Sequence, residues 1–534
     1  MKKLFYTLIL LIGTTATQQA QESFDFTVEL EQVNIPGLPG LHSYAFAQYD
    51  GKWLIIGGRK DGIHARQPFN AFPAAQNNSE VIVIDVNTQQ FWTAPLNVLP
   101  TGISEQLQST NMNFYQDGND LFIIGGYAYS PTADDHITFP YLTSIDVAGL
   151  VNAVVNNNSI IPYFKHITDD IFANTGGQLG KIGTTFYLVG GQRFDGRYNP
   201  MNNPTFVQTY ATAIQKFTID NSGNQLSFDN YTATTDEVHL RRRDYNLIPQ
   251  IFPDGAQGYM ISSGVFQENV NLPFLYPVEI TELGYTPVTG FNQYLSNYHS
   301  ATAALYDSDL NEMHSIFFGG ISQFYYQNGN LIQDNNVPFV KTISRVTRFA
   351  EGGLQEFVLP IEMPGLRGAG SEFIPNKTLP NYNSEIIKLN DITTDEFIIG
   401  HVYGGIFSPS LNPFTNNQTS TTSADAGIYA IKLIRNQPMS IQEINGNNPY
   451  SFKLYPNPAT TSFTVEFESQ IAGEAYYYIS NASGQILKRD ALKDLQPGNN
   501  IAVITIDEQL SSQVLSVTVV FENKFFVTKQ LIKK

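Results

Sequence analysis

The chain of 534 residues contains no cysteine, and only 15% of its residues are charged. Without cysteine, disulfides, thiolate metal sites and a cysteine nucleophile are all excluded. The sequence also lacks any long segment with the 3.6-residue apolar periodicity of an amphipathic helix. Aromatic residues are abundant instead, with 29 Tyr and 37 Phe. This composition suits pleated, half-buried surfaces, so we expect an all-β protein.

Positive charge is scarce as well, because 30 Lys and Arg against 48 Asp and Glu leave a net charge of −18. This balance argues against a nucleic-acid backbone or an anionic membrane as the main partner. An acidic surface keeps a large β protein soluble, and calcium binding is the alternative explanation. We expect no cofactor and no metal, because the Asp-rich turn 306–312 lacks the glycine and the terminal glutamate of an EF-hand loop.

Residues 1–20 have the pattern of a secretory signal peptide. Two lysines precede an apolar run from Leu4 to Ile12, and small polar residues follow up to Ala20. The run is too short to span a membrane, so we expect cleavage near Ala20. No later segment reaches 18 uninterrupted apolar residues. The sequence therefore predicts export and no transmembrane span in the mature chain.

A short apolar run that ends in two glycines recurs along the chain. It appears as LIIGG, LFIIGG, FYLVGG, SIFFGG and HVYGG, with a degenerate copy, MISSG, between the third and fourth. The last glycines are Gly58, Gly126, Gly191, Gly264, Gly320 and Gly405. In each unit a strand of small residues and a turn come before the motif, and a third strand follows. Four antiparallel strands in each of six units predict a six-bladed β-propeller over residues 22–440.

The glycine pairs carry a resemblance to a known family. Glycine permits close backbone approach and backbone angles that a side chain forbids. The pattern resembles the kelch repeat family, and the first unit matches it best, with Gly57-Gly58 followed by Trp92. The resemblance covers about 400 residues and implies a fold like that of galactose oxidase. Because an open last blade would expose a strand edge, we expect residues 24–30 to pair with the sixth blade.

The C-terminal part of the chain has a different pattern. Residues 441–451 are polar and rich in asparagine, which is typical of a linker. Residues 452–534 resemble the C-terminal sorting domain of type IX (Por) secretion in Bacteroidetes-like bacteria. The matching residues are Tyr455, Pro456, Asn457 and Pro458, then Ser483, Gly484 and Gln485, and finally Lys533 and Lys534. The resemblance implies a small immunoglobulin-like sandwich, the type IX machinery as a partner, and delivery to the outer cell surface or the medium.

Propeller ligands usually bind at the mouth of the central channel, where every blade contributes residues. When the units are aligned on their glycines, polar residues occupy the start of each first strand. They are His42 and Ser43, Ser109 and Thr110, Asn174 and Thr175, Arg242 and Arg243, His299 and Ser300, and Arg367. Such a ring suits anionic or sugar-like groups; the alternative is that these residues only satisfy backbone groups and water. A metal bound between His42 and His299 is a further alternative.

Three consecutive arginines precede Asp244 in the segment LRRRDYN (240–246). In a strand, Arg241 and Arg243 would face one side and Arg242 the other, so they cannot all contact one ligand. Pairing of an arginine with Asp244 and contact with a ligand both stay open.

The catalytic signatures of several propeller enzymes are missing. There is no cysteine for a copper oxidase, there are too few tryptophans for a quinoprotein, and there is no sialidase box or G-x-S-x-G motif. We therefore expect a secreted or cell-surface protein that binds a glycan, peptide or partner protein at the channel mouth. One alternative is a hydrolase or lyase acting on polysaccharide, with acids such as Asp244 and Glu372. The other is a structural or adhesion component without a small ligand.

Overall fold

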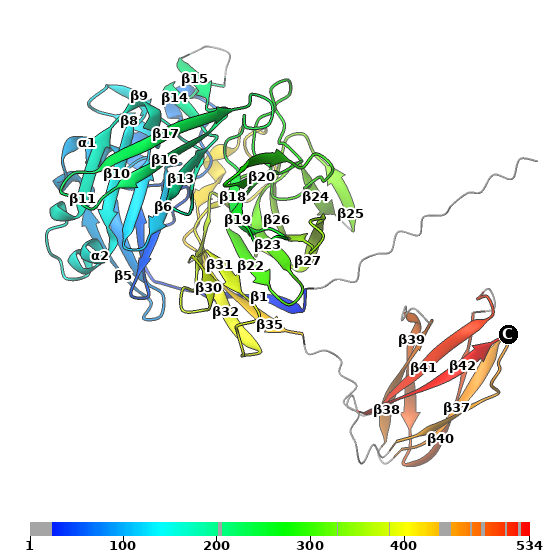
Figure 1. The fold of residues 1–534 in the computed structure, drawn as a ribbon. Coiled ribbons are helices and arrows are strands. Elements are labelled where there is room, and N and C mark those ends of the chain that lie inside the picture. Colours follow the sequence, from blue (N-terminus) through cyan, green and yellow to red (C-terminus); the bar gives the residue numbers. More distant parts are fainter. Residues whose placement is uncertain are drawn as a thin grey trace, which may run out of the picture. The chain divides into compact units, whose positions relative to one another are not determined.

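The computed structural model describes residues 24–200, 205–327, 329–383, 385–436, 450–469, 472–481, 486–507, 510–521 and 525–534. The predicted signal peptide, most of the predicted linker and the Ser483-Gly484-Gln485 motif lie outside these residues. The chain divides into two compact units, Met1–Asn436 and Gln437–Lys534 (Figure 1). Within the described residues, no helix is both long and apolar enough to cross a membrane.

The first unit contains six sheets of at least four strands each, numbered here by the chain order of their innermost strands. The first sheet consists of β2 (Ala45–Tyr49), β3 (Lys52–Ile56), β4 (Glu80–Asp85) and β5 (Gln90–Pro95). The second consists of β6 (Asn113–Asp117), β7 (Asp120–Ile124), β10 (Tyr141–Asp146) and β11 (Phe164–Thr168). The third consists of β12 (Gln178–Ile182), β13 (Thr185–Val189), β16 (Ala213–Asp220) and β17 (Ser227–Thr235).

The other three sheets follow the same plan. The fourth consists of β18 (Asn246–Ile251), β19 (Gln257–Ser262), β20 (Val278–Thr281) and β21 (Gly284–Pro287). The fifth consists of β22 (Thr302–Asp307), β23 (Glu312–Ile321), β26 (Phe339–Arg348) and β27 (Leu354–Glu362), extended by β31 (Ile386–Lys388) and β30 (Asn381–Tyr382). The sixth consists of β29 (Glu372–Pro375), β32 (Glu396–Tyr403), β35 (Ile428–Arg435) and β1 (Phe26–Val33).

Short elements decorate this frame. Small hairpins are formed by β8 (Tyr127–Ser130) with β9 (Asp135–Thr138), β14 (Gln192–Gly196) with β15 (Phe206–Tyr210), and β24 (Phe324–Gln327) with β25 (Asn330–Gln333). A further small sheet joins β28 (Leu366–Ala369), β33 (Ile406–Ser408) and β34 (Ser423–Ala424). The α-helices are α1 (Thr101–Gln106) and α2 (Val147–Val155), the latter capped by the Asp146 side chain. The expectation of an all-β protein is confirmed.

The N-terminal strand β1 completes the last sheet. It pairs antiparallel with β35 from Phe26 opposite Arg435 to Val33 opposite Ile428. This confirms the prediction that the segment beginning at residue 24 pairs with the final unit. The first strand thus covers an edge that would otherwise leave backbone N–H and C=O groups unpaired.

Apolar clusters between the sheets form a closed circuit. Six clusters join the first and second sheets (Leu54, Leu121), the second and third (Phe122, Leu188), the third and fourth (Val189, Ile261), the fourth and fifth (Met260, Phe317), the fifth and sixth (Phe318, Ile399), and the sixth and first (Tyr403, Ile55). Each sheet therefore buries both faces against neighbours, which explains the continuous apolar runs in the second and third strands.

A ring of backbone hydrogen bonds lies where the six innermost strands begin. The N–H of Ser43 donates to Gly370 O (2.7 Å), Gly370 to His299 O (2.9 Å), His299 to Asp244 O (2.9 Å), Asp244 to Gly176 O (2.7 Å), Gly176 to Asn111 O (3.1 Å), and Asn111 to Ser43 O (3.1 Å). Each sheet contributes one residue, and the six bonds close on themselves. We call these six residues the backbone ring.

The glycine pairs allow neighbouring sheets to approach each other. Gly125 has a φ of 67°, and a Cβ atom there would lie 1.8 Å from the carbonyl oxygen of Asn174 in the next unit. The following residue, Gly126, donates its N–H to that same oxygen over 3.0 Å. In the degenerate copy Ser263 takes the first position with a φ of 57°. The pair therefore permits close contact between sheets and left-handed backbone angles, although a serine adopts the first position in the degenerate copy.

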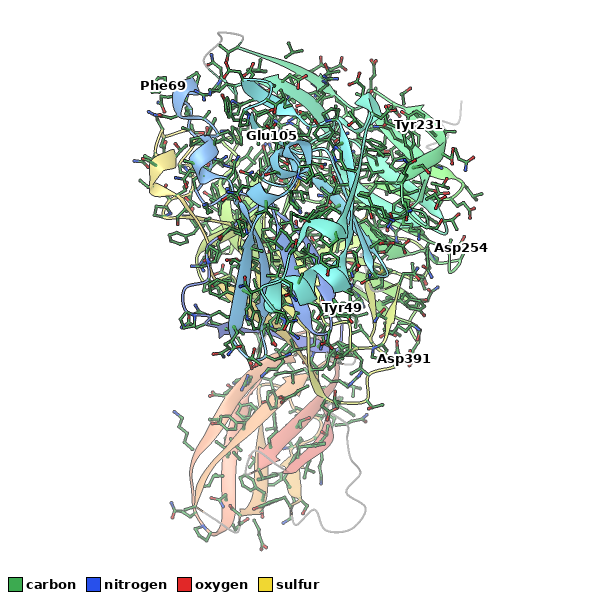
Figure 2. The ribbon with its side chains drawn as sticks, turned by 90° about the vertical axis from the view of Figure 1, so that its left-hand side faces the viewer. Tyr49, Phe69, Glu105, Tyr231, Asp254 and Asp391 are labelled. Atoms are coloured by element: carbon green, nitrogen blue, oxygen red, sulfur yellow. The ribbon has the colours of Figure 1, made fainter. Side chains whose placement is uncertain are left out.

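The first unit has two distinct ends. The segments that follow the glycine pairs gather at one end, which we call the loop end, and the turns between first and second strands lie toward the other. Figure 2 shows Phe69, from a segment after a glycine pair, near the upper end of this unit, and Tyr49 and Asp391 in its lower part.

The second unit consists of two sheets that share one apolar core. One sheet contains β36 (Phe452–Tyr455), β37 (Ser462–Ser469) and β40 (Gly498–Thr505), and the other contains β39 (Ile486–Leu495), β38 (Gly473–Ser480), β41 (Gln513–Phe521) and β42 (Phe525–Lys533). Asn457 binds the last strand, since its Nδ2 donates to Gln530 O (2.8 Å) and its Oδ1 accepts from Ile532 N–H (2.9 Å). The Tyr-Pro-Asn-Pro motif is thus tied to the C-terminal strand.

Candidate functional site

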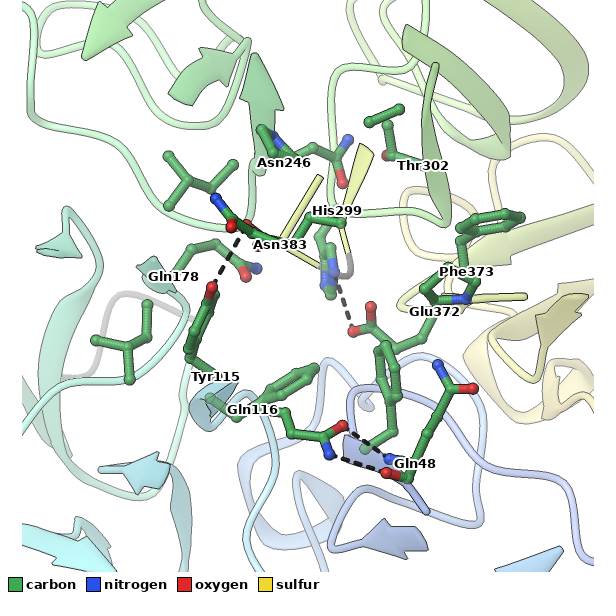
Figure 3. A pocket seen from close by; sticks show the side chains of 18 of the residues that line it. Gln48, Tyr115, Gln116, Gln178, Asn246, His299, Thr302, Glu372, Phe373 and Asn383 are labelled. Carbon is green, nitrogen blue, oxygen red and sulfur yellow. Dashed lines mark hydrogen bonds and ion pairs between the residues drawn. The ribbon is translucent and has the colours of Figure 1, made fainter. Parts of the chain in front are cut away.

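A cavity of about 190 Å³ lies among the innermost strands of all six sheets (Figure 3). Amide and aromatic side chains make up nine of its twenty lining residues. They are Gln48, Gln116, Gln178, Asn246 and Asn383, with Phe46, Phe114, Tyr115 and Phe373. Alternate residues of one strand face the same side, so that Phe46 and Gln48 on β2, and Phe114 and Gln116 on β6, both reach the cavity. Amide groups beside aromatic rings can hydrogen-bond and pack against a small polar molecule.

Two of the amide residues are fixed by each other. The Nε2 of Gln116 donates to Gln48 O over 2.8 Å, and the N–H of Gln48 donates to Gln116 Oε1 over 2.9 Å. This reciprocal pair joins the first and second sheets at the cavity wall. Only the backbone of Gln48 takes part, and its Nε2 has no hydrogen-bond partner among the described residues. The Gln178 side chain also has no such partner there, so its amide is available to a ligand.

An acid and a histidine meet at the end of the cavity next to the backbone ring. His299 Nε2 lies 3.1 Å from Glu372 Oε1, and both residues line the cavity (Figure 3). Burial alone would lower the pKa of His299, but the Glu372 carboxylate more than offsets this effect and raises it. The pair therefore favours a protonated imidazole beside a carboxylate.

A segment between β29 and β32 also lines the cavity. We call residues 376–383 and 385–395 the strap. Its strand β31 runs parallel to β22, with Ile386 opposite Ala304. The strap contributes Lys377 and Glu385 to the cavity. The strap therefore adds a lysine and a glutamate to a cavity that is otherwise lined mainly by the sheets.

Glu385 is held by two tyrosines from different sheets. Its Oε2 accepts from Tyr259 Oη (3.2 Å) and from Tyr115 Oη (3.4 Å). Burial raises the pKa of Glu385 to about 7, although the two hydroxyls and Lys377 oppose the shift. Lys377 donates from Nζ to Gln116 Oε1 over 2.8 Å, and burial lowers its pKa to about 8. Both groups therefore exchange protons near neutral pH.

Only part of the polar ring expected from the sequence borders this cavity. His299 and Ser300 line it, and Ser43, Asp244 and His299 line a smaller adjoining cavity at the backbone ring. Thr110 and Thr175 lie one residue before the ring members Asn111 and Gly176. Their backbones bridge to Tyr127 and Gln192 instead. Ser109 and Asn174 are buried and line neither cavity.

Arg242 packs inside the fourth sheet, away from the cavity. It is 0% exposed, and its guanidinium donates to the carbonyls of His239 (2.9 Å), Ser263 (2.8 Å) and Tyr276 (2.7 Å). Strand β18 begins only at Asn246, so the three arginines are not in a strand, contrary to the geometry assumed from the sequence. Arg241 and Arg243 nevertheless share one side, at Tyr210.

The remaining candidates pair with carboxylates. Arg243 pairs with Asp244. Arg367 Nη1 lies 2.8 Å from Asp425 Oδ2. His42 Nε2 lies 3.8 Å from Asp61 Oδ1. No cluster of three or more His, Asp or Glu suited to a metal is present among the described residues, and His42 and His299 each have a carboxylate partner instead.

Sequence reasoning missed the amide lining, Lys377 and Glu385. The alternation within each first strand, such as Phe46 and Gln48, carries the signal for the residues that face the axis. The strap carries no comparable signal, since it belongs to the sixth unit but packs against the fifth sheet.

Residues 453–534 match the family described as a secretion system C-terminal sorting domain. These residues are therefore a Por secretion sorting domain, and the chain is exported to the cell surface or the medium. No curated protein matches the chain.

Solved structures give distant likenesses. The structure described as "Structure of YjhT" has 11% identity and a TM-score of 0.42, covering 75% of this chain and 100% of that one. A sucrose-6-phosphate hydrolase from Lactobacillus gasseri has 10% identity and a TM-score of 0.27, covering 93% and 88%. Because both TM-scores are below 0.5, neither likeness carries an argument about this chain. The kelch resemblance therefore stays a prediction from the glycine pairs.

Proposed function

We propose that residues 24–436 form a six-bladed propeller and that the exported protein binds a glycan through its central cavity. The closed circuit of six apolar clusters and the six-membered backbone ring support the propeller assignment. The glycan assignment rests on one observation, the amides and aromatic rings that five of the six sheets and the strap contribute to the cavity. Its volume of about 190 Å³ is below the range of drug-sized pockets, so it suits a single sugar unit.

The test uses the side chain of Gln178, which lines the cavity and makes no bond within the described fold. We expect the full chain to bind members of a glycan array and Gln178→Ala to weaken the strongest interaction about tenfold, the usual effect of losing one buried hydrogen bond. Gln32→Ala, on the exposed side of β1, is the matched control. Equal affinities of wild type and Gln178→Ala, or no glycan bound at all, would refute the proposal.

A second candidate function is hydrolysis or elimination on a polysaccharide. It is favoured by Glu385, a carboxylic acid with a pKa of about 7 in the same cavity as Glu372. A pKa near the working pH is what a general acid needs, and a second carboxylate is what such reactions pair it with. Release of new reducing ends from a polysaccharide panel, lost in Glu385→Gln, would establish this function. Binding without release would leave the glycan-binding function alone.

A further inference from the structure

The loop end carries an aromatic cluster built from several sheets. The ring of His64 lies 4.5 Å from Tyr198, 5.1 Å from Phe72 and 5.4 Å from Phe414, measured between centroids. These residues follow the glycine pairs of the first, third and sixth sheets. Their mutual packing gathers segments far apart in the sequence into one surface on the side of the backbone ring away from the cavity.

Arginine is concentrated at this end of an otherwise acidic protein. Arg59, Arg66, Arg193 and Arg197 lie in segments that follow a glycine pair, and Arg241, Arg242, Arg243 and Arg367 lie just before members of the backbone ring. The whole chain has a net charge of −18 and only four other arginines, Arg345, Arg348, Arg435 and Arg489. Lysines do not follow this distribution, which indicates a preference for guanidinium groups at the loop end.

Most of these arginines have partners inside the fold. Arg59, Arg193 and Arg367 pair with Asp61 (2.6 Å), Asp195 (2.7 Å) and Asp425 (2.8 Å), and Arg243 pairs with Asp244. Arg242 is buried among backbone carbonyls, as described above. These residues therefore have structural partners and leave little charge for an external ligand.

Three further guanidinium groups differ from these, because they are partly exposed and, within the described residues, contact carbonyls and rings rather than carboxylates. Arg66 donates to Thr415 O (3.1 Å) and lies 5.6 Å from the centre of the Phe414 ring. Arg197 donates to Phe69 O over 3.4 Å. Arg241 donates to Phe266 O and lies 3.8 Å from the centre of the Tyr210 ring.

We infer that Arg66, Arg197 and Arg241 form a binding site for a polysaccharide that carries carboxylate groups. A guanidinium held against an aromatic face keeps N–H groups free, and its planar fork matches a carboxylate. Phe69, which is 73% exposed in the same region, offers an apolar face to a sugar ring. This site is separate from the cavity and does not depend on the proposed function.

The experiment compares three probes with the full chain by calorimetry: polygalacturonate, neutral dextran and polyglutamate. We expect polygalacturonate to bind, with an affinity that falls as salt rises, and dextran not to bind at this surface. Arg66→Gln/Arg197→Gln/Arg241→Gln should weaken polygalacturonate binding about tenfold, taking each exposed ion pair at its usual size. The control with the same charge change is Lys52→Gln/Lys341→Gln/Lys388→Gln, which should bind like wild type.

Thermal melting of each variant shows whether it is folded. If the triple arginine variant is not, Arg66→Gln/Arg197→Gln is compared with Lys52→Gln/Lys341→Gln, and a loss of about fivefold is expected. Failure of the wild type to bind polygalacturonate, or equal weakening in the lysine control, would overturn the inference. Equal, arginine-dependent binding of polyglutamate would overturn the assignment to a glycan.

Discussion

Closure of the sixth sheet by strand β1 gives the sharpest test of how the first unit is held together. The side chains of Phe24, Phe26 and Val28 are 5%, 7% and 6% exposed and belong to the cluster between the fifth and sixth sheets. The Phe26 ring lies 5.8 Å from that of Phe397. We expect Phe26→Ala/Val28→Ala to loosen this strand and weaken the whole unit, because the closed circuit of sheets would lose one junction.

The expected decrease in the free energy of unfolding follows from the burial of the Phe26 and Val28 side chains. Removing a buried phenylalanine side chain costs about 3–5 kcal/mol and trimming a buried valine about 1–2 kcal/mol, so the pair should cost about 5 kcal/mol. In a unit of this size that corresponds to a melting temperature lower by about 5–10 °C. Differential scanning fluorimetry measures it, with Gln32→Ala on the exposed side of the same strand as the control. A shift no larger than that of Gln32→Ala would refute the closing role of β1.

Three further predictions concern the strap, a glycine pair and export. Burial raises the pKa of Glu385 from 4.5 to about 7, so the folded protein binds its proton more tightly than the unfolded chain does. The resulting contribution to the free energy of unfolding is fully present below about pH 4.5 and is lost as pH rises through 7. Melting curves at pH 5 and pH 8 should therefore differ less for Glu385→Gln than for wild type, and equal differences would contradict the shift. Gly125→Ala should lower the free energy of unfolding by several kcal/mol, because the new Cβ atom would meet Asn174 O. Gly118 has a similar φ of 59° but nothing within 4 Å of a Cβ atom, so Gly118→Ala should lower it by only about 1 kcal/mol. Similar melting temperatures of the two variants would contradict the steric argument. A chain of residues 21–440 should fold but stay in the periplasm of the native host, and its normal appearance outside the cell would contradict the sorting role of the second unit.

The sheets could be predicted from the sequence because their signals are local. An apolar run ended by two glycines, such as the one at Gly125 and Gly126, reports both a buried strand and a close approach to the next unit. The same holds for the alternation in residues 24–30, which predicted the closing strand. Each signal lies within about ten residues and needs no knowledge of the rest of the chain.

The ring at the axis could be predicted only in part, because it depends on the spacing between segments. In the first three sheets the ring member lies 15 residues before the last glycine, as in 58 − 43, 126 − 111 and 191 − 176. In the sixth sheet the distance is 405 − 370 = 35, since the strap is inserted there. The alignment included Ser43 and His299, placed Thr110, Thr175 and Arg243 one residue before the ring members Asn111, Gly176 and Asp244, and missed Gly370 because of this insertion.

The three consecutive arginines show why residue type alone cannot assign a role. Arg242 donates hydrogen bonds to backbone carbonyls inside the fourth sheet, and Arg243 pairs with the ring member Asp244. Arg241 packs on the Tyr210 ring at the loop end. These neighbours differ only in the direction of their side chains. That direction is set by packing against segments 30 or more residues away, such as Tyr210 and Tyr276, which no local pattern in the sequence reveals.

The backbone ring also divides the first unit chemically. Its six N–H and six C=O groups are used in bonds to each other, so the ring offers few polar groups of its own to a ligand. Residues after the ring, such as Gln48 and Gln178, face the cavity, whereas Arg66 and Arg241 belong to segments on the other side. A sugar in the cavity and an acidic polymer at the loop end would therefore contact separate sets of residues. Because these sets share no hydrogen-bond partner within the part of the chain that the structure describes, substitutions in one should leave binding at the other unchanged.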